Sequence, residues 1–416
     1  MKLYSISLFF MSLLLVSCGK FTPFSDSINS NSDGSYAVET TLSDKELLEY
    51  GLVTVYRFQS VSNLVAVRQM NTGSPAIVGQ FSAPNLINLI QKNVKNRAPA
   101  NTSKVNNVND YSCYSAYCEA GFNAALNQIQ SQSLTLNAVP IAVVDSGVLP
   151  ATTAIKKILY SSSNVSGDTN VAEWLPHATM ISSLFAGVMN SSYANPNDIY
   201  APNAQVHSIK ITFAGDPDTS VEQQYGSMQL AVALDKAVAV GAKVVNLSLT
   251  YANKPDDNIA LVEQGIMSAA AQQGVLFVAA AGNNDADIDS TPVYPAAYNV
   301  NNLIVVGSHT SNLQKASTSN YGASVDLTAQ GASITVNDKT GEVETAGGTS
   351  FAAPLVVSAL SLYLGVQQQT NITPNVNQIL GNLFNSSNNY YAYGSGAQIS
   401  NYGRLNTQGF VQLAVN

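Results

Sequence analysis

Charged side chains are scarce in this chain of 416 residues, and their scarcity narrows the range of functions. Lys, Arg, Asp and Glu together make up 11% of the sequence, whereas soluble domains average about 25%. Lys and Arg form no run, and the formal net charge is -8. The electrostatic attraction on which nucleic-acid binding depends is missing, so no nucleic-acid partner is expected. Hydrophobic residues make up 46%, enough for a large core.

Cysteine and histidine are also rare, with three residues of each. Cys113 and Cys118 lie five positions apart, and no second pair of Cys or His lies near them. A structural zinc site needs about four such ligands, so metal binding by this pair is disfavoured. If the chain is exported, the expected state of Cys113 and Cys118 is a local disulfide.

The N-terminus carries a targeting signal. Lys2 precedes an apolar run from Leu8 to Val16, which is shorter than the roughly 20 residues of a membrane span. Residues 1–17 are therefore predicted to be a secretory signal peptide. The run ends at Cys18 in a string that resembles a bacterial lipobox, which implies cleavage before Cys18 and its acylation; the alternative is an ordinary signal peptide. Gly19 favours the outer membrane, by resemblance to known sorting patterns.

Three segments follow before the main domain. Residues 18–40 are rich in Ser, Asn and Asp and predict a flexible tether. Apolar patterning over residues 41–91 predicts a small α+β segment, with strands at 52–56 and 64–67 and a helix at 86–90. Residues 92–112 are predicted to be a linker.

From residue 113 to 416, helical patterns alternate with short apolar runs. Helices are expected at 119–131, 177–187, 223–240, 260–273 and 350–365. The apolar runs lie at 139–144, 205–211, 243–249, 275–281 and 303–306, and without strict alternation they fit strands buried on both faces. This order predicts an α/β fold with a mostly parallel, doubly wound sheet covered by helices. Functional sites of such sheets lie at the carboxyl ends of the strands.

Four segments place reactive side chains at element ends. Asp145 ends an apolar strand, and Gly147 then allows a sharp turn. His177 starts a helix, Asn283 follows another buried strand, and Ser350 starts the last long helix. Each residue taken alone has an ordinary structural role as its alternative: a turn Asp or Asn, a capping or surface His, or an N-cap Ser.

The other two histidines have simpler interpretations. His207 lies inside a strand pattern and is expected to be a packed or edge residue. His309 follows a strand and is expected in a loop. His177 is therefore the histidine to which the sequence assigns chemistry.

Together the four segments resemble the subtilisin, or subtilase, family of serine proteases. The matching strings are Asp145-Ser-Gly, His177-Ala-Thr, Ala280-Ala-Gly-Asn283 and Gly348-Thr-Ser350-Phe-Ala-Ala-Pro354. The chain order Asp, His, Ser is also that of subtilisin. Flanking segments at 244–249, 294–298 and 402–406 match as well, so the resemblance covers about residue 120 to the C-terminus and leaves out residues 1–110.

The resemblance implies a serine endopeptidase acting on protein or peptide substrates. Ser350 would be the nucleophile, His177 the general base, Asp145 the residue that orients the imidazole, and Asn283 an oxyanion donor together with the Ser350 N–H. The reaction needs no metal or other cofactor. Structural calcium is common in the family, but no site for it is assignable here.

The resemblance also assigns a substrate-lining strand, Ser248, Leu249 and Thr250, in which Thr250 replaces the usual Gly. Ala178 and Met180 replace a Gly and a His of the histidine motif. Two other functions stay open, a catalytically impaired lipoprotein that binds partners and an esterase using the same triad.

The place of residues 41–91 before the catalytic domain favours a pro-segment, with a spacer domain as the alternative. The chain is expected to act as a monomer, anchored by lipid or released by cleavage in the linker.

Overall fold

The computed structural model describes residues 35–49, 52–69, 84–95, 115–165, 175–189, 198–211, 228–251, 255–367, 375–388 and 399–415. The predicted signal peptide, Cys18, Cys113 and most of the predicted linker lie outside these ranges.

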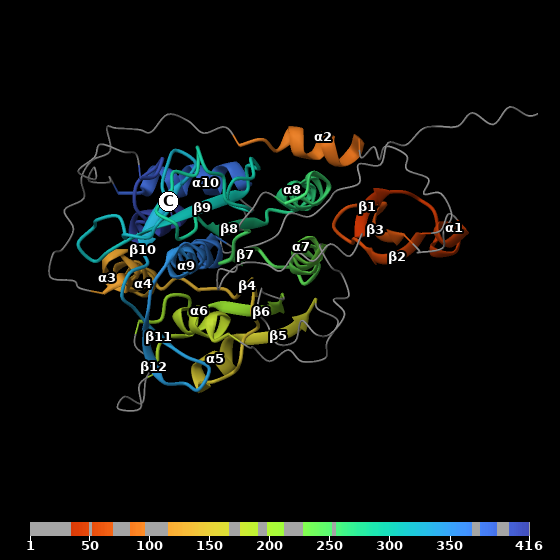
Figure 1. Ribbon diagram of the computed structural model, residues 1–416. Coiled ribbons are helices and arrows are strands. Elements are labelled where there is room, and N and C mark those ends of the chain that lie inside the picture. Colours follow the sequence, from red (N-terminus) through yellow and green to blue (C-terminus); the bar gives the residue numbers. More distant parts are fainter. Residues whose placement is uncertain are drawn as a thin grey trace, which may run out of the picture.

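Seven parallel strands form the central sheet, in the order β10-β9-β8-β7-β4-β6-β5 (Figure 1). The strands are β4 Val139–Asp145, β5 Leu159–Asn164, β6 Ala204–Lys210, β7 Val244–Leu247, β8 Leu276–Ala280, β9 Leu303–His309 and β10 Leu327–Gln330. All five predicted strands of this domain are among them. The predicted α/β class with a parallel sheet is therefore confirmed.

Helices cover both faces of the sheet, and the strands alternate their side chains between two apolar cores. In β4, Ile141 and Val143 belong to the core that holds α4, α6, α9 and α11, whereas Ala142 and Val144 belong to the core that holds α7 and α8. The helices of this domain are α4 Phe122–Ser131, α5 Thr153–Ile158, α6 His177–Ala186, α7 Gln229–Ala239, α8 Asp257–Ala271, α9 Thr349–Gln367, α10 Val376–Ser386 and α11 Thr407–Val415. This arrangement confirms the doubly wound sheet.

The helix α9 runs through the centre of the first core, which is the one that also holds α4, α6 and α11. Its length and hydropathy would suit a membrane span, but 94% of its apolar window is buried inside the domain. Its uniform apolar character therefore fits a helix surrounded by protein on all sides.

A small module precedes this domain. It consists of β1 Ser35–Glu39, α1 Asp44–Glu49, β2 Leu52–Arg57 and β3 Leu64–Gln69, with an antiparallel sheet in the order β1-β3-β2. The strands predicted at 52–56 and 64–67 are confirmed. The predicted tether boundary at residue 40 is wrong, because β1 pairs with β3 over Ser35–Glu39 and buries Ala37 and Val38. Two apolar residues in a Ser- and Asn-rich stretch are too few for a composition average to detect.

The helix α2, Pro84–Lys92, packs on α8 rather than on the three-stranded sheet (Figure 1). Leu86 fills the space above Gly265, where an added Cβ would lie 1.9 Å from Leu86 Cδ1. Lys95 Nζ donates to the Leu303 carbonyl at 2.6 Å and pairs with the buried Asp326. The predicted linker start at residue 92 is therefore wrong, because residues 92–95 are docked on the large domain. The sequence could not show this, since Lys95 and Asp326 are 231 positions apart.

The two remaining histidines differ in outcome. His207 lies in β6 and is 6% exposed, with Nδ1 2.8 Å from Ser161 Oγ, as predicted for a packed residue. His309 is the last residue of β9 and fully buried, with Nε2 3.2 Å from Glu119 Oε2. The loop prediction for His309 is wrong because β9 continues three residues beyond its apolar run.

Several elements were not predicted from the sequence. They include β5, β10, α5, α10, α11 and a hairpin of β11 Ile334–Asn337 and β12 Val343–Ala346. The helix predicted at 119–131 is two helices, α3 Ala116–Glu119 and α4. Cys118 lies in α3 and is disulfide-bonded; Cys113 lies outside the described ranges, so its pairing with Cys118 stays a prediction.

Candidate active site

Asp145 and His177 meet at the carboxyl edge of the sheet. Asp145 is the last residue of β4 and is fully buried, and His177 is the first residue of α6. His177 Nδ1 lies 2.9 Å from Asp145 Oδ1 and 3.0 Å from Oδ2. A carboxylate on Nδ1 favours the tautomer that leaves Nε2 as a proton acceptor.

Ser146 ties these two residues together, and the sequence reasoning gave it no role. Its backbone N–H donates to Asp145 Oδ1 at 2.7 Å. Its hydroxyl donates to the Leu175 carbonyl at 3.1 Å and accepts from the Ala178 N–H at 3.2 Å. Ser146 thus links the end of β4 to both sides of the α6 N-terminus. The only sequence feature that could have indicated this role is the place of Ser146 in the Asp145-Ser-Gly string.

The first turn of α9 lies against the imidazole. Ser350 is the second residue of α9 and is 3% exposed. The next residue, Phe351, places its ring centroid 5.5 Å from that of His177 in an edge-on arrangement. The structure therefore brings together the C-terminal end of β4 and the N-terminal ends of α6 and α9. A parallel sheet predicts such a meeting at its carboxyl edge.

Asn283 faces the same turn with a defined amide orientation. Its Oδ1 accepts from the Thr349 N–H at 2.8 Å and from the Thr349 hydroxyl at 3.1 Å. Two donors on one atom identify that atom as the oxygen, so Nδ2 is the donor on the other side. A Cβ on Gly348 would lie 3.1 Å from Nδ2, and Gly348 has φ +135°. Only glycine fits there without crowding this amide.

The strand predicted to line the substrate has mostly internal side chains. Ser248 and Leu249 are fully buried, whereas Thr250 is half-buried. The Ser248 hydroxyl donates to the Ser350 carbonyl at 2.8 Å. Contact between substrate and the backbone of residues 248–250 stays a prediction, but the Ser248 and Leu249 side chains serve the interior.

The two replacements in the histidine motif fit the fold. Ala178 is fully buried, and its N–H is bonded to Ser146 as described. Met180 packs against the first core. Both side chains therefore contribute apolar contacts on the buried side of α6.

The buried carboxyl of Glu263 holds Tyr251, the residue that follows the predicted substrate-lining residues 248–250. Glu263 of α8 accepts hydrogen bonds from the hydroxyls of Tyr251 at 2.7 Å and Tyr298 at 2.6 Å. The Tyr251 N–H donates to the Tyr294 carbonyl at 2.6 Å. Burial raises the pKa of the Glu263 carboxyl to about 7, although the two tyrosine hydroxyls oppose the rise. The charge of Glu263 thus changes near neutral pH.

Glu263→Gln is expected to flatten the pH dependence of stability. Between about pH 4.5 and 7 the folded chain keeps a proton on Glu263 that the unfolded chain releases, so stability falls as pH rises. The variant should lack about 3 kcal/mol of this fall. Urea unfolding at pH 5 and pH 8 measures it, with the exposed Glu342→Gln as control. An unchanged pH slope in Glu263→Gln would contradict the buried, raised carboxyl.

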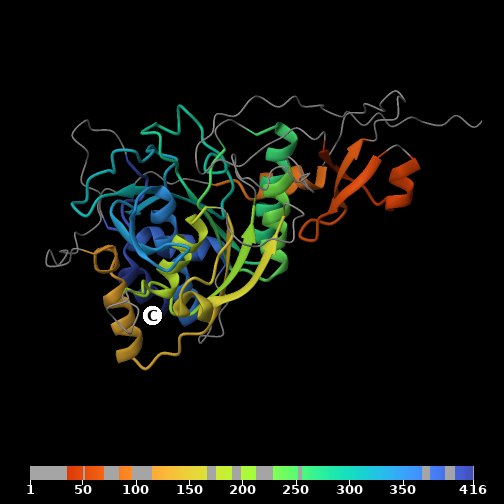
Figure 2. The same ribbon diagram turned by 60° about the horizontal axis from the view of Figure 1, so that its bottom comes forward.

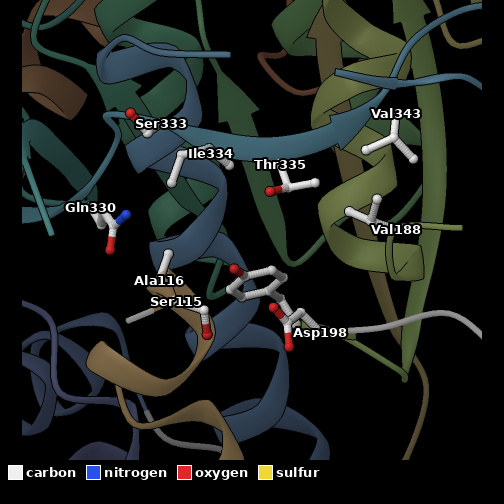
Figure 3. Close-up of a pocket in the computed structure, with 10 residues that line it drawn as sticks. Ser115, Ala116, Val188, Asp198, Gln330, Ser333, Ile334, Thr335 and Val343 are labelled. Atoms are coloured by element: carbon white, nitrogen blue, oxygen red, sulfur yellow. The ribbon is translucent and has the colours of Figure 1, made fainter. Parts of the chain in front are cut away.

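A cavity of about 270 Å³ lies elsewhere in the domain, between α3 and β11 (Figure 3). Its wall includes Ser115, Asp198, Gln330 and Thr335. None of the four predicted catalytic residues lines it, so it is separate from the site above. Within the described ranges no group of three or more His, Cys, Asp or Glu side chains could hold a metal ion.

Comparison with known proteins agrees with the fold. The subtilase family model matches residues 137–402. The chain is 32% identical over 270 residues to an alkaline protease of Alkalihalobacillus alcalophilus, covering 64% of this chain and 64% of that protein. It is 31% identical to subtilisin BL of Lederbergia lenta, covering 64% of this chain and 90% of that protein.

Solved structures show the same architecture. The epidermin leader peptide processing serine protease EpiP of Staphylococcus aureus superimposes with a TM-score of 0.64 at 16% identity, covering 92% of this chain and 98% of that chain. A cold adapted subtilisin-like serine proteinase gives a TM-score of 0.51 at 25% identity, covering 66% and 90%. With the family model matching well over half of its residues, this chain belongs to the subtilase family of serine-type endopeptidases.

Proposed function

We propose that this chain hydrolyses peptide bonds by acyl transfer through Asp145, His177 and Ser350. Ser350 Oγ attacks the peptide carbonyl while His177 Nε2 takes its proton and later gives it to the leaving amine. Asp145 holds the imidazole and stabilises its charged form. Asn283 Nδ2 and the Ser350 N–H stabilise the oxyanion. Water then releases the acyl group by the same proton transfers in reverse.

The observation that supports this proposal most is the contact of His177 Nδ1 with both oxygens of the buried Asp145. An isolated buried carboxylate is costly, and its pairing with a partly exposed imidazole is the arrangement that general-base catalysis requires. The place of Ser350 adds a second feature, since the first turn of α9 has the electrostatic character that favours an anion.

Labelling with a fluorophosphonate tests the proposal directly. Intact-mass measurement should find one adduct, and peptide mapping should place it on Ser350. A binding protein with an inert site would give no adduct. The absence of an adduct would also exclude the esterase alternative, because an esterase would use the same reactive serine. Peptide and ester substrates compared on the labelled and unlabelled chain then separate a peptidase from an esterase.

We propose further that the N-terminal module is a pro-segment that docks on the catalytic domain. It lies against α7 and α8 in both views (Figures 1 and 2). The fully buried Asp235 of α7 accepts from the Tyr56 hydroxyl at 2.9 Å, the Gln59 N–H at 3.0 Å and the Ser60 N–H at 2.7 Å. Asn258 of α8 accepts from the Ala37 N–H at 3.0 Å. A spacer domain would not require this number of directed polar contacts.

Asp235→Ala is expected to loosen the module. It removes the acceptor of four donors in the module, the hydroxyls of Tyr56 and Ser60 and the N–H groups of Gln59 and Ser60, and each lost bond weakens the docking. In the full chain carrying Ser350→Ala, which prevents self-cleavage, amide exchange over residues 35–69 should accelerate at least about tenfold. Glu342→Ala, an exposed change in the β11–β12 turn, serves as control. Equal protection in both variants would argue that Asp235 does not hold the module.

The signal peptide and Cys18 acylation complete the proposed function. With both, the enzyme is exported and anchored to the cell envelope by lipid. Cleavage of the chain between residues 96 and 112 would release the catalytic domain from this anchor. Metabolic labelling with a fatty-acid probe tests the anchor, and Cys18→Ala should abolish the label.

A further inference from the structure

The nucleophile's own carbonyl has an unusual hydrogen-bond partner. In an α-helix the carbonyl of residue i accepts from the N–H of residue i+4. For Ser350 that residue is Pro354, which lies inside α9 and has no N–H. The helix therefore cannot supply this bond to the residue that carries both the nucleophilic Oγ and an oxyanion N–H.

A side chain from the neighbouring strand supplies the bond instead. The Ser248 hydroxyl, just after β7, donates to the Ser350 carbonyl at 2.8 Å. It accepts in turn from Asn246 Nδ2 at 2.9 Å. All three residues are at most 3% exposed, so water does not compete for these bonds. The relay runs from β7 to the first turn of α9.

This relay costs stability at its far end. Asn246 lies in the middle of a buried strand, and its Oδ1 accepts no hydrogen bond from any described residue. Burying such an unpaired acceptor destabilises the fold. Its position is explained if the amide is there to orient the Ser248 hydroxyl, because Nδ2 fixes the hydroxyl as acceptor on one side and donor on the other.

We infer that Ser248 is a positioning residue for the proposed reaction, acting through the Ser350 carbonyl to replace the helical bond that Pro354 removes. The inference rests on the proposed function. Fixing this carbonyl fixes the peptide plane that follows Ser350, and with it the aim of Oγ and N–H. A small change in that aim lowers the rate of the chemical step, not the affinity for substrate.

A double-variant cycle tests the inference. Ser248→Ala should lower kcat and the fluorophosphonate labelling rate about tenfold, the loss expected for one hydrogen bond, and leave KM within twofold. Pro354→Ala supplies a backbone N–H at the missing position. In that background, Ser248→Ala should lower both rates less than threefold. Ser248→Thr keeps the hydroxyl and should recover most of the rate.

Each outcome decides the inference. The same loss in both backgrounds would overturn it, because the Ser350 carbonyl would then not be the link. A rise in KM with labelling unchanged would also overturn it and make Ser248 a substrate-contacting residue. If Ser248→Ala does not fold alone, the double variant should fold and label; its failure would count against the relay. No labelling of the unsubstituted chain would overturn both this inference and the proposed function.

Discussion

Ser350→Ala is expected to lower kcat by about 10⁶-fold and to leave the unfolding temperature nearly unchanged. The change removes one hydroxyl from the start of α9, whose buried apolar length supplies the stability of that region. Without Oγ no acyl intermediate forms, and only binding and oxyanion stabilisation remain. Because the triad acts as a unit, adding His177→Ala to this variant should cost little more.

The control for this prediction lies in the same helix. Ser358 is fully buried and donates its hydroxyl to the Pro354 carbonyl at 2.8 Å. Ser358→Ala removes the same atoms two turns further along and should leave kcat within a few-fold. Progress curves with a peptide substrate and thermal melts of both variants make the comparison. Comparable activity of Ser350→Ala and Ser358→Ala would exclude Ser350 as the nucleophile.

Asp145→Asn is expected to lower kcat by about 10⁴-fold, with the fold intact. The amide keeps the shape of the carboxylate, and its oxygen can still accept from the Ser146 N–H. Its NH₂ group then faces His177 Nδ1 and donates to it, so the ring proton moves to Nε2. A protonated Nε2 cannot accept the Ser350 proton, and the amide no longer stabilises the imidazolium.

Two measurements separate this effect from a loss of structure. The unfolding temperature should stay near that of the unsubstituted chain, and the His177 ring nitrogen shifts should report the other tautomer by NMR. Asp285→Asn, at an exposed carboxylate paired with Lys315, is the control and should keep full activity. Full activity of Asp145→Asn would mean that the observed pairing with His177 has no part in catalysis.

The sequence predicted the large domain well because its signals are local. The runs at 139–144 and 303–306 are buried strands, and their apolar composition follows from burial on both faces. The elements it missed lack such signals. The edge strand β5 reads Leu-Tyr-Ser-Ser-Ser-Asn and is largely exposed, so its pairing with β6 depends on the neighbouring strand and not on its own pattern.

Predictions at the N-terminal boundaries failed for a related reason. The strand β1 is short and lies in a Ser- and Asn-rich stretch, the segment 92–95 is short and polar, and each is ordered by a partner elsewhere in the chain. Composition describes what a segment would do alone in water. It does not report a partner such as Asp326, which gives Lys95 a buried place.

Short strings of the sequence are enough to identify the residues that can do chemistry: a carboxylate at a strand end, a histidine and a serine at helix starts, and glycines at the turns between them. These are properties of a few adjacent residues, and local backbone geometry follows from them. Which atoms of these residues meet depends on the packed fold. It turned Asn283 so that Nδ2 is the donor, tied Asp145 to α6 through Ser146, and gave the Ser350 carbonyl its bond from Ser248. The reason is that a hydrogen bond depends on the distance and direction between two groups, and for groups far apart in the chain only the packed fold sets both.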